Sequence, residues 1–330
     1  MKEKPRKSHI LTLILIPVLV VFLVMQVVAC SFDVFGTKDK NKDDKLEITI
    51  LDVGKADAIL LRTANHTVMI DSGERDHEQG ASAGFLVDYL TEQGVVALDY
   101  LIITHFDRDH VGGAAVIIEN FDVKAVIVPD YRRESRHYLR FQAAMQEKGI
   151  TAQVLASKAT YDFYFDGVEF TVYASHQEFA EYIVHDEEED DEDYLDRQHQ
   201  DDDNDDYIAA RDLPNVNNFS LVTSISHREN HFLFTADAKA ARIREILATP
   251  SITEKDYVFM QIPHHGNLNR RSLEFINAIQ PSFAVITCSH KRPPDVEIID
   301  ALADIGANVF LTADGNVYLE SDGLRIDVSQ

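Results

Sequence analysis

The residues with the clearest capacity for chemistry lie in "THFDRDHVGG", residues 104–113, which packs two histidines and two aspartates into six positions. His105, Asp107, Asp109 and His110 form the pattern H-x-D-x-D-H directly after an apolar run. Imidazole and carboxylate together suit zinc, manganese or iron, and alternating positions can serve two adjacent ions. The pattern therefore indicates a metal site, with a capped polar turn as the alternative.

Two distant segments offer the same types of side chain. Asp237 follows the apolar run of "LFTADA", and His264 and His265 follow that of "QIPHHG". Each segment taken alone could be a loop or a helix cap, and Asp237 stands where an N-cap would stand before "AKAARI". Convergence of all three segments would complete a site for two metals.

The surrounding sequence predicts the elements that carry these residues. Short β-rich runs at 46–54, 58–63 and 66–73 are followed by a segment with helical spacing at 84–94 and an apolar strand at 98–105 that ends in the motif. Strands and helices then alternate to residue 321, so a layered α/β architecture is expected. Gly112 and Gly113 are expected to let the chain turn tightly into the next helix.

The charge of the chain narrows the classes of function. The formal net charge of −25 argues against a protein that coats nucleic acid along a basic face, so we expect no stable nucleic-acid complex. More than half of this charge comes from an acidic insert at residues 186–206, with fourteen acidic side chains and one arginine. Its composition is typical of a solvated loop, and weak cation binding is the alternative.

The first thirty residues have the composition of a targeting segment. A basic start precedes an apolar run from Ile10 to Val28, and "VVAC" at its end resembles a bacterial lipobox with Cys30 as the lipidated residue. A single transmembrane anchor is the alternative. Both place the protein on the extracytoplasmic face of the cell membrane. We expect residues 1–30 to be the signal or anchor, 31–45 a linker and 46–330 the functional domain.

These motifs together resemble the metallo-β-lactamase superfamily in order and spacing: "MIDSG", "THFDRDHVGG", "LFTADA" and "PHHG". Within it, "LDVGKADAILLRT" and "NNFSLV" resemble the branch that contains the hydrolase domain of the competence protein ComEC, with the phosphorylcholine esterases as neighbours. The resemblance implies a four-layer αββα sandwich that holds two divalent metal ions, zinc or manganese, at one edge.

The resemblance also implies roles for individual residues. His105 and Asp107 would bind the first metal, Asp109 and His110 the second, and Asp237 would bridge both. One of the tandem histidines would complete the second site and the other would serve substrate or proton transfer. The sequence does not say which; our working assignment gives His264 to the metal and His265 to catalysis, beside Asp109 and Asp237. Asp71 would orient ligands without contacting metal.

Several positions depart from the usual pattern of the superfamily. Asp107 stands where a histidine is usual, which makes the site more anionic and shifts the balance toward manganese beside zinc. Asn217 and Asn218 take the place of another histidine, where they could contact phosphate or metal or form a plain turn. In "VGKADA", Asp57 is kept and Lys55 replaces a glutamine, so both are candidates for substrate contact or for support of the site.

The expected function is hydrolysis of phosphodiesters, in DNA or in a phosphate-bearing envelope polymer, by a hydroxide that bridges two ions. Two alternatives stay open. One is hydrolysis of an ester, lactone or amide by the same fold. The other is a metal-binding surface lipoprotein without turnover. The sequence does not predict the oligomeric state.

Overall fold

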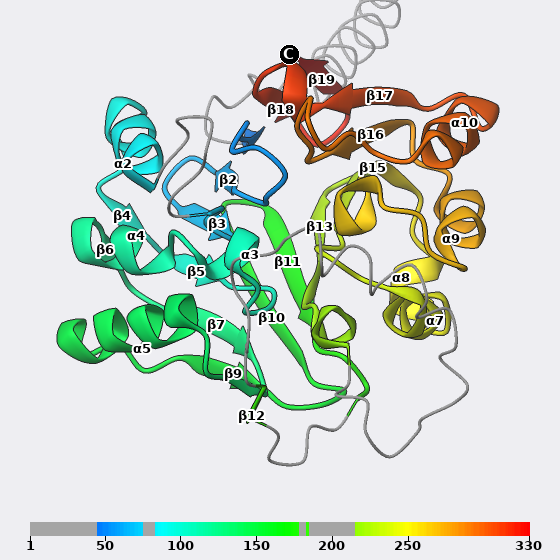
Figure 1. Cartoon of the computed structure of the whole chain (residues 1–330). Coiled ribbons are helices and arrows are strands. Elements are labelled where there is room, and N and C mark those ends of the chain that lie inside the picture. Colours follow the sequence, from blue (N-terminus) through cyan, green and yellow to red (C-terminus); the bar gives the residue numbers. More distant parts are fainter. Residues whose placement is uncertain (1–44, 75–82, 178–182, 185–214) are drawn as a thin grey trace, which may run out of the picture. The chain divides into compact units, whose positions relative to one another are not determined.

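The structure of this protein is a computed structural model that describes residues 45–74, 83–177, 183–184 and 215–330 (Figure 1). The chain divides into two units, Met1–Lys42 and Asp43–Gln330, and the described residues belong to the second. The expected signal or anchor with Cys30, residues 31–44 of the expected linker and the acidic insert at 186–206 lie outside the described residues. Those expectations stay predictions.

Two large β-sheets form the centre of the unit Asp43–Gln330. The first sheet has, in spatial order, β19 (Ile326–Ser329), β18 (Val317–Ser321), β1 (Leu46–Ile50), β2 (Ile59–Arg62), β3 (Thr67–Ile70), β5 (Tyr100–Ile102), β7 (Val126–Pro129) and β9 (Gln153–Leu155). The second has β10 (Thr160–Phe165), β11 (Val168–Tyr173), β13 (Val222–His227), β14 (Asn230–Phe234), β15 (Tyr257–Gln261), β16 (Phe283–Ile286) and β17 (Asn308–Leu311). Two short parallel pairs join β4 (Ala97–Leu98) to β6 (Asp122–Val123) and β8 (Arg132–Arg133) to β12 (Ile183–Val184).

Each large sheet contains four neighbouring strands that run parallel. β3, β5, β7 and β9 run parallel in the first sheet, as do β14, β15, β16 and β17 in the second. The carboxyl ends of parallel strands meet at one edge of a sheet, where open α/β folds place functional groups. The expected metal ligands follow β14 and β15, which are neighbours in the second sheet, and β5 of the first sheet, so strand order and the packing of the two sheets together bring them toward one another.

Helices cover the outer face of each sheet (Figure 1). One layer comprises α2 (Ala83–Glu92), α4 (Ala114–Asn120) and α5 (Arg136–Lys148), and the other comprises α7 (Ala240–Leu247), α8 (Pro250–Thr253), α9 (Ser272–Ile279) and α10 (Val296–Asp304). Short helical turns at the site are α3 (Arg108–Val111), η1 (Val216–Phe219) and η2 (Pro263–Gly266), and η3 (Thr312–Asp314) follows β17. This arrangement confirms the predicted four-layer αββα sandwich.

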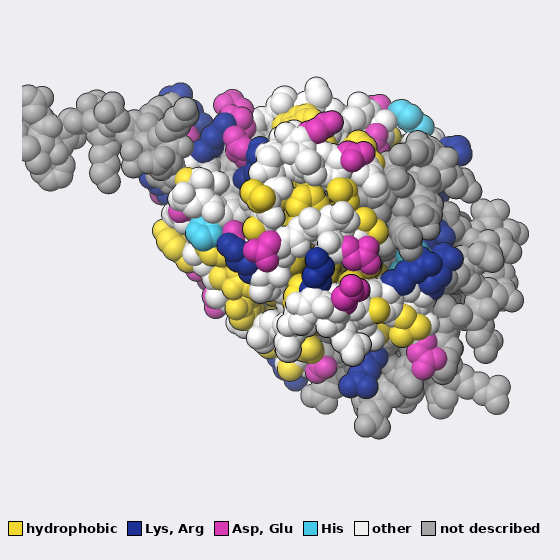
Figure 2. Space-filling model, turned by 90° about the vertical axis from the view of Figure 1, so that its left-hand side faces the viewer, with side chains coloured by type: hydrophobic (Ala, Val, Ile, Leu, Met, Phe, Trp, Pro, Cys, Tyr) yellow, Lys and Arg dark blue, Asp and Glu magenta, His cyan; other side chains and the backbone are white. Residues whose placement is uncertain are grey.

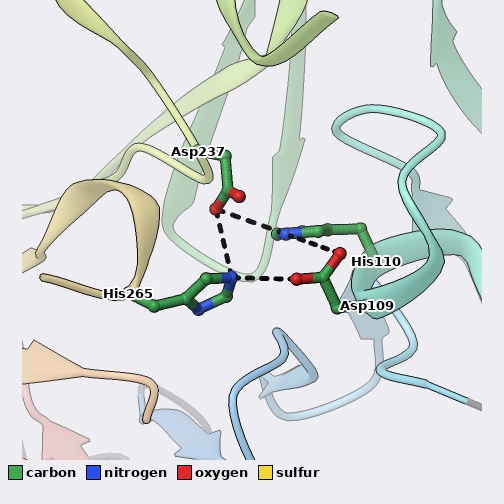
Figure 3. Close-up of side chains that lie close together, drawn as sticks. All are labelled: Asp109, His110, Asp237 and His265. Carbon is green, nitrogen blue, oxygen red and sulfur yellow. Dashed lines mark hydrogen bonds and ion pairs between the residues drawn. The ribbon is translucent and has the colours of Figure 1, made fainter. Parts of the chain in front are cut away.

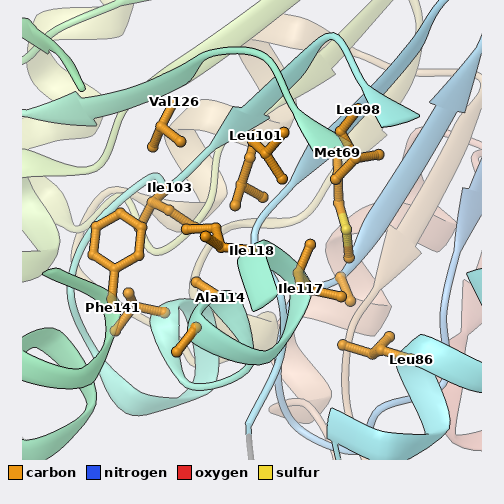
Figure 4. Packing of buried hydrophobic residues seen from close by; sticks show 14 of the residues in the cluster. Met69, Leu86, Leu98, Leu101, Ile103, Ala114, Ile117, Ile118, Val126 and Phe141 are labelled. Atoms are coloured by element: carbon orange, nitrogen blue, oxygen red, sulfur yellow. The ribbon is translucent and has the colours of Figure 1, made fainter. Parts of the chain in front are cut away.

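Three apolar clusters hold the four layers together. One joins the first sheet to its helices, where Leu101, Ile117 and Phe141 are almost completely buried (Figure 4). A second cluster lies between the sheets and a third lies beneath α7, α9 and α10. Full burial of a side chain as large as Phe141 stabilises the fold by about 1.5–3 kcal/mol. Strands buried on both faces explain why the sequence shows nearly continuous apolar runs there.

Gly113 is needed for a close approach between two segments of the site. A Cβ atom at this position would lie 2.3 Å from the carbonyl oxygen of Ser72, and the Gly113 N–H donates to the Gly73 carbonyl at 3.1 Å. Its φ of −85° is ordinary for any residue. Gly113 is therefore needed because it has no Cβ atom and so allows close packing against residues 72–73. The sequence analysis had instead expected a glycine that allows a tight turn of the backbone.

Charged side chains of both signs are interspersed on the face shown in Figure 2, which lies on the side of α2, α4 and α5.

Across the described part of the chain, no helix combines the length and apolar character needed to cross a membrane.

Candidate metal centre

Four side chains from three strand ends point toward one another: Asp109, His110, Asp237 and His265 (Figure 3). Each offers one ligand-type atom, and these atoms all lie within 4.8 Å of one another. His265 Nε2 lies 3.2 Å from Asp109 Oδ2 and 3.4 Å from Asp237 Oδ1. His110 Nε2 lies 3.3 Å from Asp237 Oδ1. The predicted convergence of Asp237 and a tandem histidine on the H-x-D-x-D-H loop is what the structure shows.

His105 and Asp107 lie beside this group and share Asp237 with it. His105 Nε2 is 3.6 Å from Asp107 Oδ2 and 3.9 Å from Asp237 Oδ2. Asp237 therefore faces His110 and His265 with one oxygen and His105 with the other, as a carboxylate shared between two sites would.

The site has a buried floor and an accessible rim. The side chains of His105 and His110 are fully buried and Asp237 is 4% exposed, whereas Asp107 and Asp109 are 24% and 29% exposed. The site is therefore open to solvent on the side of these two aspartates.

Asp71 orients two histidines of the floor. Its Oδ2 accepts hydrogen bonds from His110 Nδ1 at 2.8 Å and from the Thr104 hydroxyl at 2.6 Å. The same hydroxyl lies 3.1 Å from His105 Nδ1. Because Nδ1 of each ring serves this network, Nε2 of each ring is directed into the site. The structure thus places Asp71 where the resemblance implied, behind the ligands.

Asp57 and Thr287 support His265 from behind. His265 Nδ1 donates to the Thr287 carbonyl at 2.9 Å and lies 3.7 Å from Asp57 Oδ1. Gln261 donates from Nε2 to Asp57 Oδ2 at 2.8 Å, and its Oε1 accepts from the N–H groups of Thr235 and Ala236. Gln261 thereby ties the loop of Asp237 to Asp57.

A repeated threonine is a signal that the sequence reasoning missed. Thr104, Thr235 and Thr287 each follow an apolar strand of the site, in "IITH", "LFTAD" and "VITC". All three are buried, and each hydroxyl bonds to the site's supporting residues, at 2.6 Å to Asp71, 2.7 Å to the Gln261 carbonyl and 2.9 Å to His265 Nδ1. Gln261 and Thr287 could have been found as polar residues at the ends of otherwise apolar strands.

The backbone of the site is conformationally unusual. Asp71, Ala236, His264 and His265 have φ values of 55°, 47°, 53° and 56°, in the left-handed region that non-glycine residues rarely occupy. Such conformations cost of order 1–3 kcal/mol each and persist where the surrounding structure enforces them. Their concentration at the ends of β3, β14 and β15 marks this edge as specialised.

The pKa values of the site residues are shifted by burial and by the charges of neighbouring carboxylates and histidines. Burial opposes ionisation of Asp237, but the charges of His265 and His110 hold its pKa well below the ordinary range. Burial also opposes protonation of His110, yet Asp237, Asp109 and Asp71 raise its pKa well above the ordinary value. For His105, burial and the charge of His110 lower the pKa to about 4. Burial likewise opposes protonation of His265, but Asp237, Asp109 and Asp57 raise its pKa, so protonated rings would offset the carboxylates and metal binding would release their protons.

The donor set fits divalent metal ions. Among the described residues, the buried atoms that lack a hydrogen-bond partner include His105 Nε2, His110 Nε2 and Asp237 Oδ1. Buried polar atoms are almost always satisfied in folded proteins, so unsatisfied atoms gathered on both sides of Asp237 fit bound ligands such as metal ions. Two or three histidine nitrogens with carboxylates suit zinc or manganese.

The tandem histidines occupy different positions. His265 is 2% exposed and belongs to the cluster, whereas His264 lies outside the group of converging atoms. The geometry favours His265 as the ligand and His264 as the neighbouring group, the reverse of our working assignment. The sequence could not choose, because the left-handed turn of η2 decides which ring faces inward.

The remaining candidates are near the site but differ in role. Asn218 Oδ1 accepts the backbone N–H of Arg242 at the start of α7, which is a structural use. Asn217 is buried in η1 next to it. Lys55 is 8% exposed and donates to Asn267 Oδ1 at 3.2 Å, beside the loop of the tandem histidines.

The sequence model of the metallo-β-lactamase superfamily matches residues 51–290. The chain therefore belongs to this superfamily, and its site has the residue set of a metal-dependent hydrolase of that class. The resemblance drawn from the motifs is confirmed.

Individual relatives carry names from the ComE operon and from recombination. The chain is 23% identical over 255 residues to ComE operon protein 3 of Bacillus subtilis, a match that covers 73% of this chain and 28% of that protein. It is 22% identical over 288 residues to Recombination protein 2 of Haemophilus influenzae, covering 86% and 30%. The chain thus spans less than a third of the length of these relatives.

Solved structures share the fold. A variant of the CmlA β-hydroxylase has a TM-score of 0.51 at 13% identity, covering 84% of this chain and 54% of that one. A metal-dependent hydrolase of the β-lactamase superfamily has a TM-score of 0.50 at 10% identity, covering 84% and 98%. At this identity the likeness concerns the fold alone.

Proposed function

We propose that this protein is a metal-dependent phosphodiester hydrolase. The observation that carries the proposal is the convergence of Asp109, His110, Asp237 and His265 from strand ends of the two sheets, with unsatisfied buried atoms among them. Two divalent ions in such a site would supply an activated water and a clamp on the oxygens of a phosphoryl group.

The protein's own residues prepare this site. Asp71 fixes the rings of His110 and, through Thr104, His105. Asp237 is placed to be shared between the two halves of the site. His264 lies outside the cluster, and burial together with the charges of Lys239, His265 and Lys55 lowers its pKa well below the ordinary value, so its imidazole would take part in proton transfer in the neutral form.

Two further features support a phosphodiester as the substrate. Asp107 replaces an imidazole with a carboxylate, which favours harder ions such as manganese beside zinc. The names of two relatives concern recombination and competence, in Recombination protein 2 of Haemophilus influenzae and in competence protein ComA of Neisseria gonorrhoeae. DNA and phosphate-bearing envelope polymers share the diester chemistry, and the net charge of −25 favours a transient encounter over a stable nucleic-acid complex.

The cellular location is part of the proposal. The basic start, the apolar run and Cys30 support a domain held by lipid, or by a single helix, at the extracytoplasmic face of the membrane. Metabolic labelling with a fatty acid tests this: label should enter the wild-type chain and not the Cys30→Ser variant. Equal labelling of both would exclude Cys30 as the lipidated residue.

The test of function compares three chromogenic substrates with the full-length protein loaded with zinc or manganese. We expect hydrolysis of bis(p-nitrophenyl) phosphate, its loss in Asp237→Asn, and its retention in the remote variant Asp166→Asn. Turnover of p-nitrophenyl acetate or a chromogenic β-lactam without turnover of the diester would indicate an ester or amide hydrolase instead. Bound metal with no turnover of any substrate would indicate a metal-binding surface protein.

A further inference from the structure

Asp107 contacts a second partner that the metal site does not explain. Its Oδ2 faces His105 Nε2 at 3.6 Å, while its Oδ1 accepts a hydrogen bond from Nη1 of Arg133. The same Nη1 donates to the carbonyl of Phe106 at 3.3 Å. The carboxylate of Asp107 thus contacts both His105, an expected metal ligand, and the guanidinium of Arg133.

The segment that carries Arg133 is fixed against the motif loop. The Tyr131 hydroxyl accepts the N–H of Phe106 at 2.7 Å, and the two rings lie 4.7 Å apart. Arg133 itself lies in β8, and Ser135 then caps α5 by accepting the N–H of Tyr138. The guanidinium is therefore held in place from both sides, and loses little freedom when it binds a further group.

Arg133 lies at the accessible rim of the site. Its side chain is 14% exposed and that of Asp107 is 24% exposed, in contrast with the buried floor. The guanidinium is therefore partly open to solvent beside Asp107, one of the two partly exposed aspartates of the site.

Aspartate at position 107 is what allows this pairing. A histidine that binds metal through one ring nitrogen presents only an N–H at the other, which repels a guanidinium. A carboxylate has two oxygens, so it can face the site with one and hold an arginine with the other. The departure from the usual H-x-H-x-D-H pattern therefore brings a fixed positive charge beside the reacting position.

We propose that Arg133, held by Asp107, binds a non-bridging oxygen of the substrate phosphate and selects anionic phosphodiesters over neutral esters. The planar guanidinium has five N–H donors, so it can contact a carboxylate and a phosphate at once. This inference rests on the proposed function and specifies the group that recognises its substrate. It also provides a local positive charge in a protein of net charge −25.

The experiment compares Arg133→Met with Arg62→Met in the full-length, metal-loaded protein. Arg62 is a matched control because it also pairs with one carboxylate, Glu47, and one backbone carbonyl, that of Gln93, far along the first sheet. The readouts are KM and kcat for bis(p-nitrophenyl) phosphate and for a neutral p-nitrophenyl triester, the Kd of inorganic phosphate, and metal content.

We expect Arg133→Met to raise the diester KM and the phosphate Kd by about 10- to 100-fold, the loss associated with a hydrogen bond between charged groups. Metal content and the kinetics of the neutral triester should match those of Arg62→Met, and Arg133→Lys should be intermediate. Loss of metal, or an equal loss on both substrates, would show that Arg133 only supports the fold of the loop. A phosphate Kd equal to that of the control would overturn the proposal.

A second pair of variants tests the coupling to Asp107. Asp107→His restores the usual metal ligand but removes the acceptor for Arg133, so its diester KM should rise as in Arg133→Met. The double variant should show no further rise, because residues that act as a unit are not additive. Independent, additive losses would contradict the coupling. If the wild type binds phosphate through Arg133 but cleaves no diester, the proposed function fails while the binding role stands.

Discussion

Replacing Asp71 by asparagine should weaken metal binding, because Asp71 orients the imidazole of His110. The carboxylate is fully buried and accepts from the Thr104 N–H, the Thr104 hydroxyl and His110 Nδ1, at 2.8, 2.6 and 2.8 Å. Asparagine has the same shape but only one acceptor oxygen. If that oxygen keeps the Thr104 N–H, the new amide N–H group faces His110 Nδ1.

The magnitude follows from the tautomer of His110. An Nδ1 that must accept a hydrogen bond leaves the proton on Nε2, and a protonated Nε2 cannot bind metal. The Thr104 hydroxyl, which links Asp71 to His105, also has to reorient. Loss of such an orienting partner typically costs 10–100-fold in metal affinity, about 1.4–2.8 kcal/mol. The effect in Asp71→Asn should reach the upper part of this range, since two histidines are affected.

The assay is competition for zinc or manganese between the protein and a chromogenic chelator. Asp166→Asn is the control, because Asp166 also accepts three hydrogen bonds, from the Thr63 hydroxyl and from the N–H groups of Asn65, yet it lies away from the site. The control should lose some stability and keep its metal affinity. A metal affinity in Asp71→Asn within threefold of the wild type would refute the reasoning.

Two other predictions follow from the same structure. His265→Ala should bind one metal ion fewer than the wild type, measured by elemental analysis, whereas His264→Ala should bind the full complement; the opposite result would restore our working assignment of the tandem histidines. Asp99→Asn tests stability against pH: burial opposes ionisation of Asp99, but Lys124, the Thr67 N–H and His66 hold its pKa below the ordinary value of 3.8. A carboxylate with a lowered pKa stabilises the fold when the pH is above the ordinary pKa, and this stabilisation is lost as the pH falls. The wild type should therefore lose its stability advantage over Asp99→Asn below about pH 4. Urea unfolding at pH 7 and pH 3 measures the difference in free energy of unfolding between the wild type and Asp99→Asn. An equal difference at both pH values would contradict a lowered pKa of Asp99.

Much of the site could be predicted because its residues are concentrated at strand ends. The H-x-D-x-D-H spacing, "LFTADA" and "PHHG" each combine an apolar strand with polar residues that the core cannot use, and the carboxyl ends of parallel strands are where such residues gather in each of the two sheets. Arg133 could not be found in this way. Arg133 lies in β8, and only its contact with Asp107, 26 residues earlier in the chain, places it at the site.

The sequence by itself determined the layered α/β fold, the ligand types and three of the segments that supply them, because apolar periodicity and residue chemistry are local properties. Only the tertiary structure decided which tandem histidine faces inward, that Asp71 orients two rings, and that Asp107 holds Arg133. These outcomes depend on backbone conformations and side-chain directions that are set by packing between distant segments, such as the left-handed turn at His264 and His265.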